Sequence, residues 1–411
     1  DDVADRLSEG FGGCQGLRSE GRAFDVELQH AAKGRRLFRA SRGFEKKADL
    51  AKIVTEAACQ ALQWTADDQS VPGDVLCFLP GEPEIRRCKK ELEARLSRVA
   101  SKVPRAGRPS SPRGFGAQVK TISLGSQPVD VLPLHGALDA EAQDRAVMPS
   151  KDRERRRVIL ATNVAEASIT VQGVTCVVDS GLRKRSIFDP ATGFNRLELA
   201  PISAASADQR KGRAGRLQNG LCLRLWAADE SLRPEDAPAI TEEDLTGVLL
   251  QLLDTGTALK DILSRLPWLD PPPLKSIEHA SDVLRLLGAI KTTSEEEDVL
   301  TAHGRVMARL PLHPRLAHMV VKAKPEDMNS SSTVFSSIAS LCALLEEERD
   351  VLQDSQRRVG ACADVATRLL ALSGEEMPQL RYKNLTMLPK QCSRVLQNAC
   401  RLEEDLPSAS R

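Results

Sequence analysis

The stretch PGDVLCFLPG, residues 72–81, is the clearest structural signal in this sequence. The apolar centre of this stretch, residues 74–79, is short and has a Pro-Gly pair on each side. A short apolar run between such breakers is typical of a strand that is buried on both faces, as strands of parallel sheets are. We therefore predict a buried parallel strand at this point.

Strands and helices alternate around this strand. A helical spacing of apolar residues precedes it, and a charged helix follows it. The expected elements are helices at 45–64, 84–98 and 139–147, and strands at 131–134, 157–161 and 176–179. This alternation predicts an α/β layer with a parallel sheet. A strand-like piece at 24–28 lies in a Gly-rich, charged stretch, residues 1–44, which we interpret as a connector.

The second half of the chain changes character. After Trp226 the pattern is helical, with a helix start expected at Thr241 and Asp244 and a break at PWLDPPP, residues 267–273. Further helices are expected at 276–289, 314–323, 333–346 and 357–372. The tail from 374 is polar and weakly patterned, and residues 99–118, which contain no acidic residue, are interpreted as a solvated insertion. With 411 residues, the chain is expected to form two or three domains.

Composition excludes several kinds of protein. The net charge is +1, so a nucleic-acid surface has to be a local patch, and aromatic residues, at 3%, are too scarce for a base-stacking platform. The ten cysteines show no CxxC pairing and the six histidines are dispersed, so no metal site is predicted. Scattered cysteines of this kind predict reduced thiols in an intracellular protein, located in the cytoplasm or in an organelle. No apolar run is long enough for a membrane span. The N-terminus, DDVADRLSEG, lacks Met and a targeting pattern, so we expect it to lie within a longer protein.

The run QRKGRAGR, residues 209–216, carries two arginines three residues apart, Arg213 and Arg216, each preceded by glycine. If the run opens a helix, both guanidinium groups lie on one face, and the small residues let the backbone approach a ligand closely. Two fixed, planar cations suit a polyphosphate. The alternative is a solvated basic turn.

A hairpin is expected between 182 and 199. Residues 183–188 and 194–199 flank the turn DPATG, and the first strand begins with Arg183, Lys184 and Arg185. A solvated antiparallel edge is the alternative to a functional hairpin.

Three loops that follow predicted strands carry distinctive residues: FLPG at 78–81, ATNVAEASITVQG at 161–173, and VVDSG at 177–181 together with QRKGRAGR. In their order they resemble motifs IV, V and VI in the second RecA-like lobe of DEAH-box ATP-dependent RNA helicases. We call residues 161–173 the motif V segment. The strings SEGRAFDVE, LPLHGALDAEAQ, WLDPPP, LTAHGRVMARLPLHPRLAHM and ALLEEERDVL are similar to the bacterial HrpB-type branch. The resemblance covers about residues 19–372.

The resemblance implies a fold class and a domain order. The chain would be an α/β, RecA-like parallel-sheet lobe followed by mostly helical winged-helix and ratchet domains. The expected bounds are 1–44 for a connector from a first lobe, 45–228 for the second lobe, 229–295 for the winged helix, 296–373 for the ratchet and 374–411 for the tail.

The resemblance also implies roles at the nucleotide. Arg213 and Arg216 match the arginine fingers that contact the γ-phosphate of ATP, and Gln209 matches a glutamine near the attacking water. Thr170 and Gln172 match positions that line the nucleotide. Relatives carry an acid that holds the ribose where this chain has Gln172, and some carry an aromatic residue on adenine near Val147, so weak base preference is expected.

For RNA, the resemblance implies contacts from Thr162 and Asn163 to the phosphate backbone, and a hairpin that acts as a wedge with Arg183, Lys184 and Arg185 at its base. Thr162 and Asn163 have an alternative role as caps of the helix that follows the strand. We assign no role to Asp179 and no ligand role to His135 or His303.

No GxxxxGK[ST] and no DEAH tetrapeptide occurs in the chain. ATP and Mg²⁺ would therefore be held mostly by a first lobe that this chain lacks, and the chain alone is expected to be inactive. The leading hypothesis is the C-terminal part of an ATP-dependent helicase acting on single-stranded RNA, with DNA also open. The alternative is a non-catalytic RNA- or protein-binding module.

Overall fold

The computed structural model describes residues 2–15, 24–31, 47–67, 73–100, 121–124, 127–150, 152, 155–166, 169–190, 192–293, 298–323, 333–346, 352–354, 372, 385–387 and 389–405. The chain divides into two compact units. The first, here the sheet unit, comprises Leu17–Ile187 and Arg196–Ala237. The second, here the helical unit, comprises Asp1–Gly16, Phe188–Asn195 and Pro238–Arg411.

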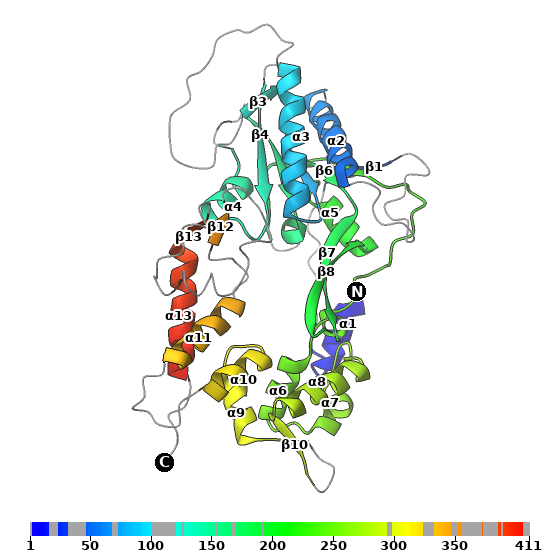
Figure 1. Cartoon of the computed structure of the whole chain (residues 1–411). Helices are drawn as coiled ribbons and strands as arrows, with labels where there is room; N and C mark the ends of the chain where they lie inside the picture. The colour runs from blue at the N-terminus through cyan, green and yellow to red at the C-terminus, as the bar shows by residue number, and fades with distance from the viewer. Residues whose placement is uncertain are drawn as a thin grey trace. The chain divides into compact units, whose positions relative to one another are not determined.

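A seven-stranded sheet forms the centre of the sheet unit, in the order β1-β9-β6-β2-β5-β4-β3 (Figure 1). Its strands are β1 (Val26–His30), β2 (Asp74–Phe78), β3 (Thr121–Leu124), β4 (Gln127–Leu134), β5 (Arg156–Ala161), β6 (Val174–Asp179) and β9 (Gly220–Arg224). Neighbouring strands are parallel except for β3, which pairs antiparallel with β4. The parallel sheet predicted from the alternation is thus confirmed, with one antiparallel edge added.

Helices cover both faces of this sheet, which explains why its central strands are apolar throughout. The helices α2 (Lys47–Asp67) and α3 (Glu82–Ala100) lie side by side over one face (Figure 1). Successive residues of one strand enter different cores: Val75 and Cys77 join the core under α2 and α3, whereas Leu76 and Phe78 join the core that includes Ala146 of α4 (Ala140–Val147). Each leucine buried in this way contributes about 1.5–3 kcal/mol.

The strand β1 lies in the stretch expected to be a connector. It pairs with β9 in parallel register over its whole length, from Val26 with Gly220 to His30 with Arg224. This part of residues 1–44 therefore belongs to the sheet. The expectation missed the pairing because β1 is an edge strand with polar positions, whose partner lies almost 200 residues later in the chain.

The helical unit has its own core. Its helices are α1 (Asp2–Gly10), α6 (Thr246–Asp254), α7 (Leu259–Arg265), α8 (Leu274–Leu286), α9 (Ala302–Arg309), α10 (Pro314–Ala323), α11 (Thr333–Glu346) and α13 (Pro389–Asp405). The short strands β10 (Ile290–Thr292) and β11 (Asp298–Leu300) pair antiparallel, as do β12 (Leu352–Asp354) and β13 (Leu385–Met387). Leu249, Leu284, Val320 and Val395 are among the side chains that share one buried cluster.

Several expectations for this half need correction. The helix expected to start near Thr241 begins at Thr246, because residues 239–241 form a separate 3₁₀ turn and Asp244 accepts the N–H of Thr246 at 2.9 Å. The domain boundary expected at 295/296 lies outside the described residues, between β10 and β11, and stays a prediction. In the tail, α13 buries Val395, Ala399 and Leu402 at helical spacing, an apolar stripe concealed by its many charged neighbours. The insertion beyond residue 100 and the helix expected at 357–372 lie outside the described residues, apart from Leu372.

A hydrogen-bonded carboxylate in the helical unit makes its stability pH-dependent. Burial would raise the pKa of Asp244, but hydrogen bonds from His313, at 2.8 Å, and from Thr246 outweigh it and lower the pKa to about 2. An unfolded Asp titrates near 3.9, so this contribution is complete above about pH 4 and is lost as the pH falls toward 2.

We therefore expect the free energy of unfolding to fall between about pH 4 and pH 2, and Asp244→Asn to remove part of that dependence. Urea unfolding at a series of pH values measures it. Asp254→Asn, on an exposed position of the same helix, should keep the wild-type slope. Identical pH profiles for Asp244→Asn and the wild type would contradict the assignment.

Among the described helices, none combines the length and the apolar character needed to cross a lipid bilayer.

Candidate functional site

The candidate site lies at the carboxyl ends of three neighbouring strands of the sheet unit. Phe78 ends β2, Asp179 ends β6, and the motif V segment follows β5. The helix α5 (Ala204–Gly212) packs against this edge, and Ser203 caps it by accepting the N–H of Ser206 at 3.1 Å. Loops at this edge of a parallel sheet are where open α/β proteins bind ligands.

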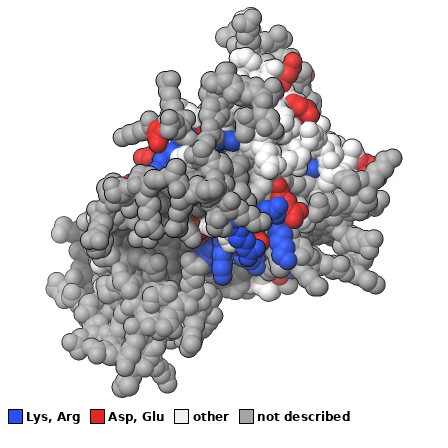
Figure 2. All heavy atoms as spheres, turned by 90° about the horizontal axis from the view of Figure 1, so that it is seen from above, with Lys and Arg blue, Asp and Glu red and all other residues white. Residues whose placement is uncertain are grey.

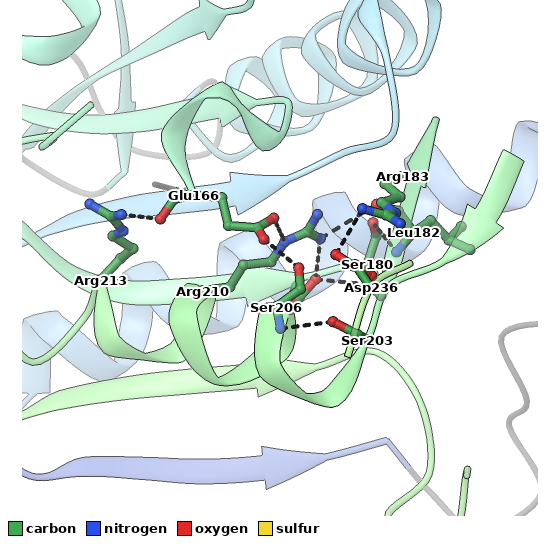
Figure 3. A network of polar contacts seen from close by, with 11 residues as sticks. Glu166, Ser180, Leu182, Arg183, Ser203, Ser206, Arg210, Arg213 and Asp236 are labelled. Carbon is green, nitrogen blue, oxygen red and sulfur yellow. Dashed lines mark hydrogen bonds and ion pairs between the residues drawn. The ribbon is translucent and has the colours of Figure 1, made fainter. Parts of the chain in front are cut away.

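Arg210 is the centre of a buried ionic cluster (Figure 3). Its Nε donates to Glu166 Oε2 at 2.8 Å and its Nη1 to Asp179 Oδ1 at 2.9 Å. Its guanidinium lies 4.7 Å from the ring centroid of Phe78. The hydroxyl of Ser206 donates to the other oxygen of Glu166. One arginine thus joins residues of the motif IV, V and VI stretches.

The cluster is strongly desolvated. The side chains of Arg210 and Asp179 are 1% and 0% exposed, and that of Glu166 is 14% exposed. Burial alone would lower the pKa of Arg210, but the charges of Asp179 and Glu166 outweigh it and raise the pKa, so the guanidinium stays charged. The cluster therefore holds two acids around one permanent cation.

Arg213 and Arg216 follow α5 instead of opening it. QRKG is the last turn of the helix, Arg213 is its C-cap, and Arg216 lies in the turn beyond. The condition considered above, that the run opens a helix, is not met, because the helix begins earlier, after the cap Ser203. The two guanidinium groups are brought near each other by the turn: burial first, and then the charge of Arg216, lower the pKa of Arg213.

Both arginines contact the motif V segment. Arg213 donates to the carbonyls of Glu166 and Ile169, the latter at 3.2 Å, and is 8% exposed. Arg216 is exposed, and its Nη1 donates to the hydroxyl of Thr170 at 2.5 Å. The arrangement can offer guanidinium and hydroxyl donors to an anion.

The close approach expected at the glycines of this run occurs within the protein. A Cβ on Gly215 would lie 2.6 Å from the carbonyl oxygen of Phe24 and 2.7 Å from Val26, so Gly215 is required for packing against β1. A Cβ on Gly212 would meet nothing within 4 Å. At Gly215 the absence of a side chain is therefore explained by packing within the protein, and not by the close approach of a ligand.

The other predicted residues are spread along the motif V segment and α5. Thr162 is half-buried at the N-cap of a short 3₁₀ helix, Asn163–Ala165, and makes no side-chain capping bond, so capping does not account for it. Asn163 and Gln209 are exposed. Gln172 has an exposed side chain, and its N–H donates to the carbonyl of Val147 at 3.2 Å. Gln172 and Val147, the two positions where the resemblance implied a difference from relatives, are therefore neighbours.

The basic side chains at the start of the hairpin are all paired with acids. The hairpin consists of β7 (Leu182–Asp189) and β8 (Phe194–Pro201). Arg183 pairs with Asp236 at 2.8 Å, Lys184 with Glu84 at 3.4 Å, and Arg185 with Glu198 at 3.8 Å. Figure 2 shows acidic side chains beside basic ones on the surface that it colours. A phosphate backbone would have to compete with these carboxylates.

The sequence patterns did not reveal this cluster: they assign no role to Asp179 and do not single out Glu166, Ser206 or Arg210. One signal is present, since an acid at the end of a strand as apolar as VTCVVD is expected to be buried, and a buried acid needs a partner. The choice of Arg210 as that partner was not readable from the sequence.

Comparison with known proteins identifies similar helicases. Residues 115–218 match the model of the helicase conserved C-terminal domain. The chain is 33% identical over 345 residues to the ATP-dependent RNA helicase HrpB of Escherichia coli K12, a match of 84% of this chain and 35% of that protein. It is 31% identical over 360 residues to HrpA of the same organism, which covers 86% of this chain and 24% of HrpA.

Solved structures agree as well. A crystal structure of the E. coli DExH-box NTPase HrpB matches with a TM-score of 0.67 at 29% identity, over 98% of this chain and 39% of that one. A second crystal structure, of the E. coli DEAH/RHA helicase HrpB, gives 0.69 at 29% identity, over 99% and 41%.

A parallel sheet with a RecA-like arrangement, motif-bearing loops at its carboxyl edge and a matching C-terminal helicase domain define a helicase lobe. Within that class, the chain belongs to the family of the HrpB and HrpA RNA helicases. It spans about a third of the length of HrpB.

Proposed function

We propose that this chain supplies the second RecA-like lobe and the following helical region of an ATP-dependent RNA helicase. Arg213 and Arg216 contact the γ-phosphate of ATP held by a first lobe, Gln209 lies near the attacking water, and Thr170 and Gln172 line the nucleotide. The first lobe supplies the phosphate loop and the Mg²⁺ ligands. The observation that carries this proposal is the hydrogen bond from Arg216 to Thr170, which joins motif VI to motif V at an exposed position.

In the same proposal, single-stranded RNA runs past Thr162 and Asn163, whose hydroxyl and amide groups bind phosphate oxygens without reading sequence. The hairpin β7–β8 acts as the wedge. The three basic residues at the start of the hairpin are paired with acids, so we assign them mainly the role of fixing the hairpin's position, and RNA binding second. They are Arg183, Lys184 and Arg185. The winged helix and the ratchet domain lie in the helical unit, and the intracellular location stays a prediction.

Hydrolysis of Mg-ATP tests this function. We expect the chain alone to show no turnover above background, and the chain joined to an HrpB-type first lobe to hydrolyse ATP faster when RNA is added. Robust turnover by the pure chain would contradict the assignment of the phosphate loop to another lobe. RNA binding without turnover in the joined protein would favour the alternative, a non-catalytic binding module.

A further inference from the structure

Arg213, the side chain proposed to contact phosphate, is held by the motif V segment. Arg213 donates to the backbone carbonyls of Glu166 and Ile169, so the position of its guanidinium depends on the positions of these two carbonyls. The backbone of the motif V segment is bonded near both ends: the N–H of Glu166 donates to the carbonyl of Asn163, and that of Gln172 to the carbonyl of Val147. Neither bond joins the segment to α5, so the question is which contact holds it beside Arg213.

The side chain of Glu166 does so. One carboxylate oxygen accepts from Arg210 at 2.8 Å and the other from the hydroxyl of Ser206, so it is held at two points of α5. Arg210 is in turn fixed by Asp179 at the end of β6. Glu166 is therefore bound twice to the same part of the chain (Figure 3). Its carbonyl accepts from Arg213, and its side chain accepts from Arg210, in the helix that leads to Arg213.

We propose that Glu166 and Arg210 are positioning residues, whose buried ion pair holds the motif V segment against α5 and thereby fixes the guanidinium of Arg213. Neither residue touches the nucleotide. The proposal rests on the proposed function only for its consequence in catalysis, because the restraint on Arg213 is a property of the chain alone. Arg216 contacts the same segment through the hydroxyl of Thr170, but its guanidinium is already exposed, so its reactivity depends little on this restraint.

An arginine-specific reagent tests the restraint on the 411-residue chain without ATP. Phenylglyoxal modification of each arginine, followed by mass spectrometry, reports how often its guanidinium is free. In the wild type, Arg213 should react more slowly than Arg216, because it is buried and bound to two carbonyls. In Glu166→Gln, which weakens a charge-assisted hydrogen bond, Arg213 should react at least ~5-fold faster, with Arg216 little changed.

An ion pair elsewhere in the sheet unit provides the control. Arg155 and Asp130 lie 3.1 Å apart, and the side chain of Asp130 is 16% exposed, close to the 14% of Glu166. Asp130→Asn should therefore weaken a partly buried ion pair of the same sheet without speeding the modification of Arg213. The milder variant Ser206→Ala removes one hydrogen bond to Glu166 and should raise the Arg213 rate by a smaller factor. An unchanged Arg213 rate in folded Glu166→Gln, or an equal rise in Asp130→Asn, would overturn the proposal.

The catalytic consequence is measured separately. In a protein that also contains a first lobe, Glu166→Gln should lower kcat for ATP and leave KM within about twofold, because a misplaced finger affects the transition state more than binding. An equal rise in KM and loss of kcat would assign Glu166 to nucleotide binding instead. If the joined protein has no ATPase at all, the proposed function fails, whereas the modification experiment still decides the positioning role.

Discussion

Arg216→Ala should lower kcat for ATP hydrolysis by at least ~10³ when the chain is joined to a matching first lobe. The guanidinium of Arg216 is exposed and bound only through the Thr170 hydroxyl among the contacts described here, so it can turn to a phosphate without loss of a buried partner. Removing an interaction that forms in the transition state lowers kcat and kcat/KM together. Steady-state ATPase measurements with saturating RNA provide the test.

Arg213→Ala should cause a loss of similar size, with an additional cost in stability because Arg213 is buried. Arg86→Ala provides the control: Arg86 is 45% exposed on α3 and pairs with Glu82 one turn away. It should leave kcat within about twofold, as expected for a surface ion pair. ATPase activity in Arg216→Ala equal to that of Arg86→Ala would refute the finger assignment.

Arg210→Ala should lower the free energy of unfolding of the sheet unit by about 3–5 kcal/mol. The substitution leaves Glu166 and Asp179 buried without their cation, and it removes the guanidinium that packs on Phe78. Urea unfolding followed by circular dichroism measures the change. A native-like midpoint would show that water reaches the two carboxylates, against the burial described here.

The expected mechanism is loss of charge compensation, and a second substitution tests it. Because Asp179→Asn removes one of the two uncompensated charges, the double variant with Arg210→Ala should be less destabilised than the sum of the single variants. Arg145→Ala is the matched control, since its pair with Glu141 has side chains that are 42% and 87% exposed. It should cost less than about 1 kcal/mol.

The elements that matched the sequence expectations share a local signal. The strands β2, β5 and β6 are short apolar runs, and α11 spans the predicted residues 333–346. Where the signal was mixed, the expectations were incomplete or wrong. The strand β1 was expected at 24–28, but its polar edge positions concealed its place in the sheet. The apolar stripe of α13 is hidden among charged residues, and the helix before Arg213 begins after the cap Ser203, ahead of the run QRKGRAGR.

The α/β class, the helicase motifs and the pair Arg213 and Arg216 could be recognised from the sequence, because they depend on residue types at short spacing. The contact between Arg216 and Thr170, 46 residues apart, could not. Only the tertiary structure decided that Arg210, and not Arg213, carries the buried ion pairs. Its partners Glu166 and Asp179 lie 44 and 31 residues away. They meet because β5 and β6 lie on either side of β2, an order that differs from their order in the chain. The charge of the buried Arg210 is compensated because these strand ends bring two acids to it, and that depends on the sheet order.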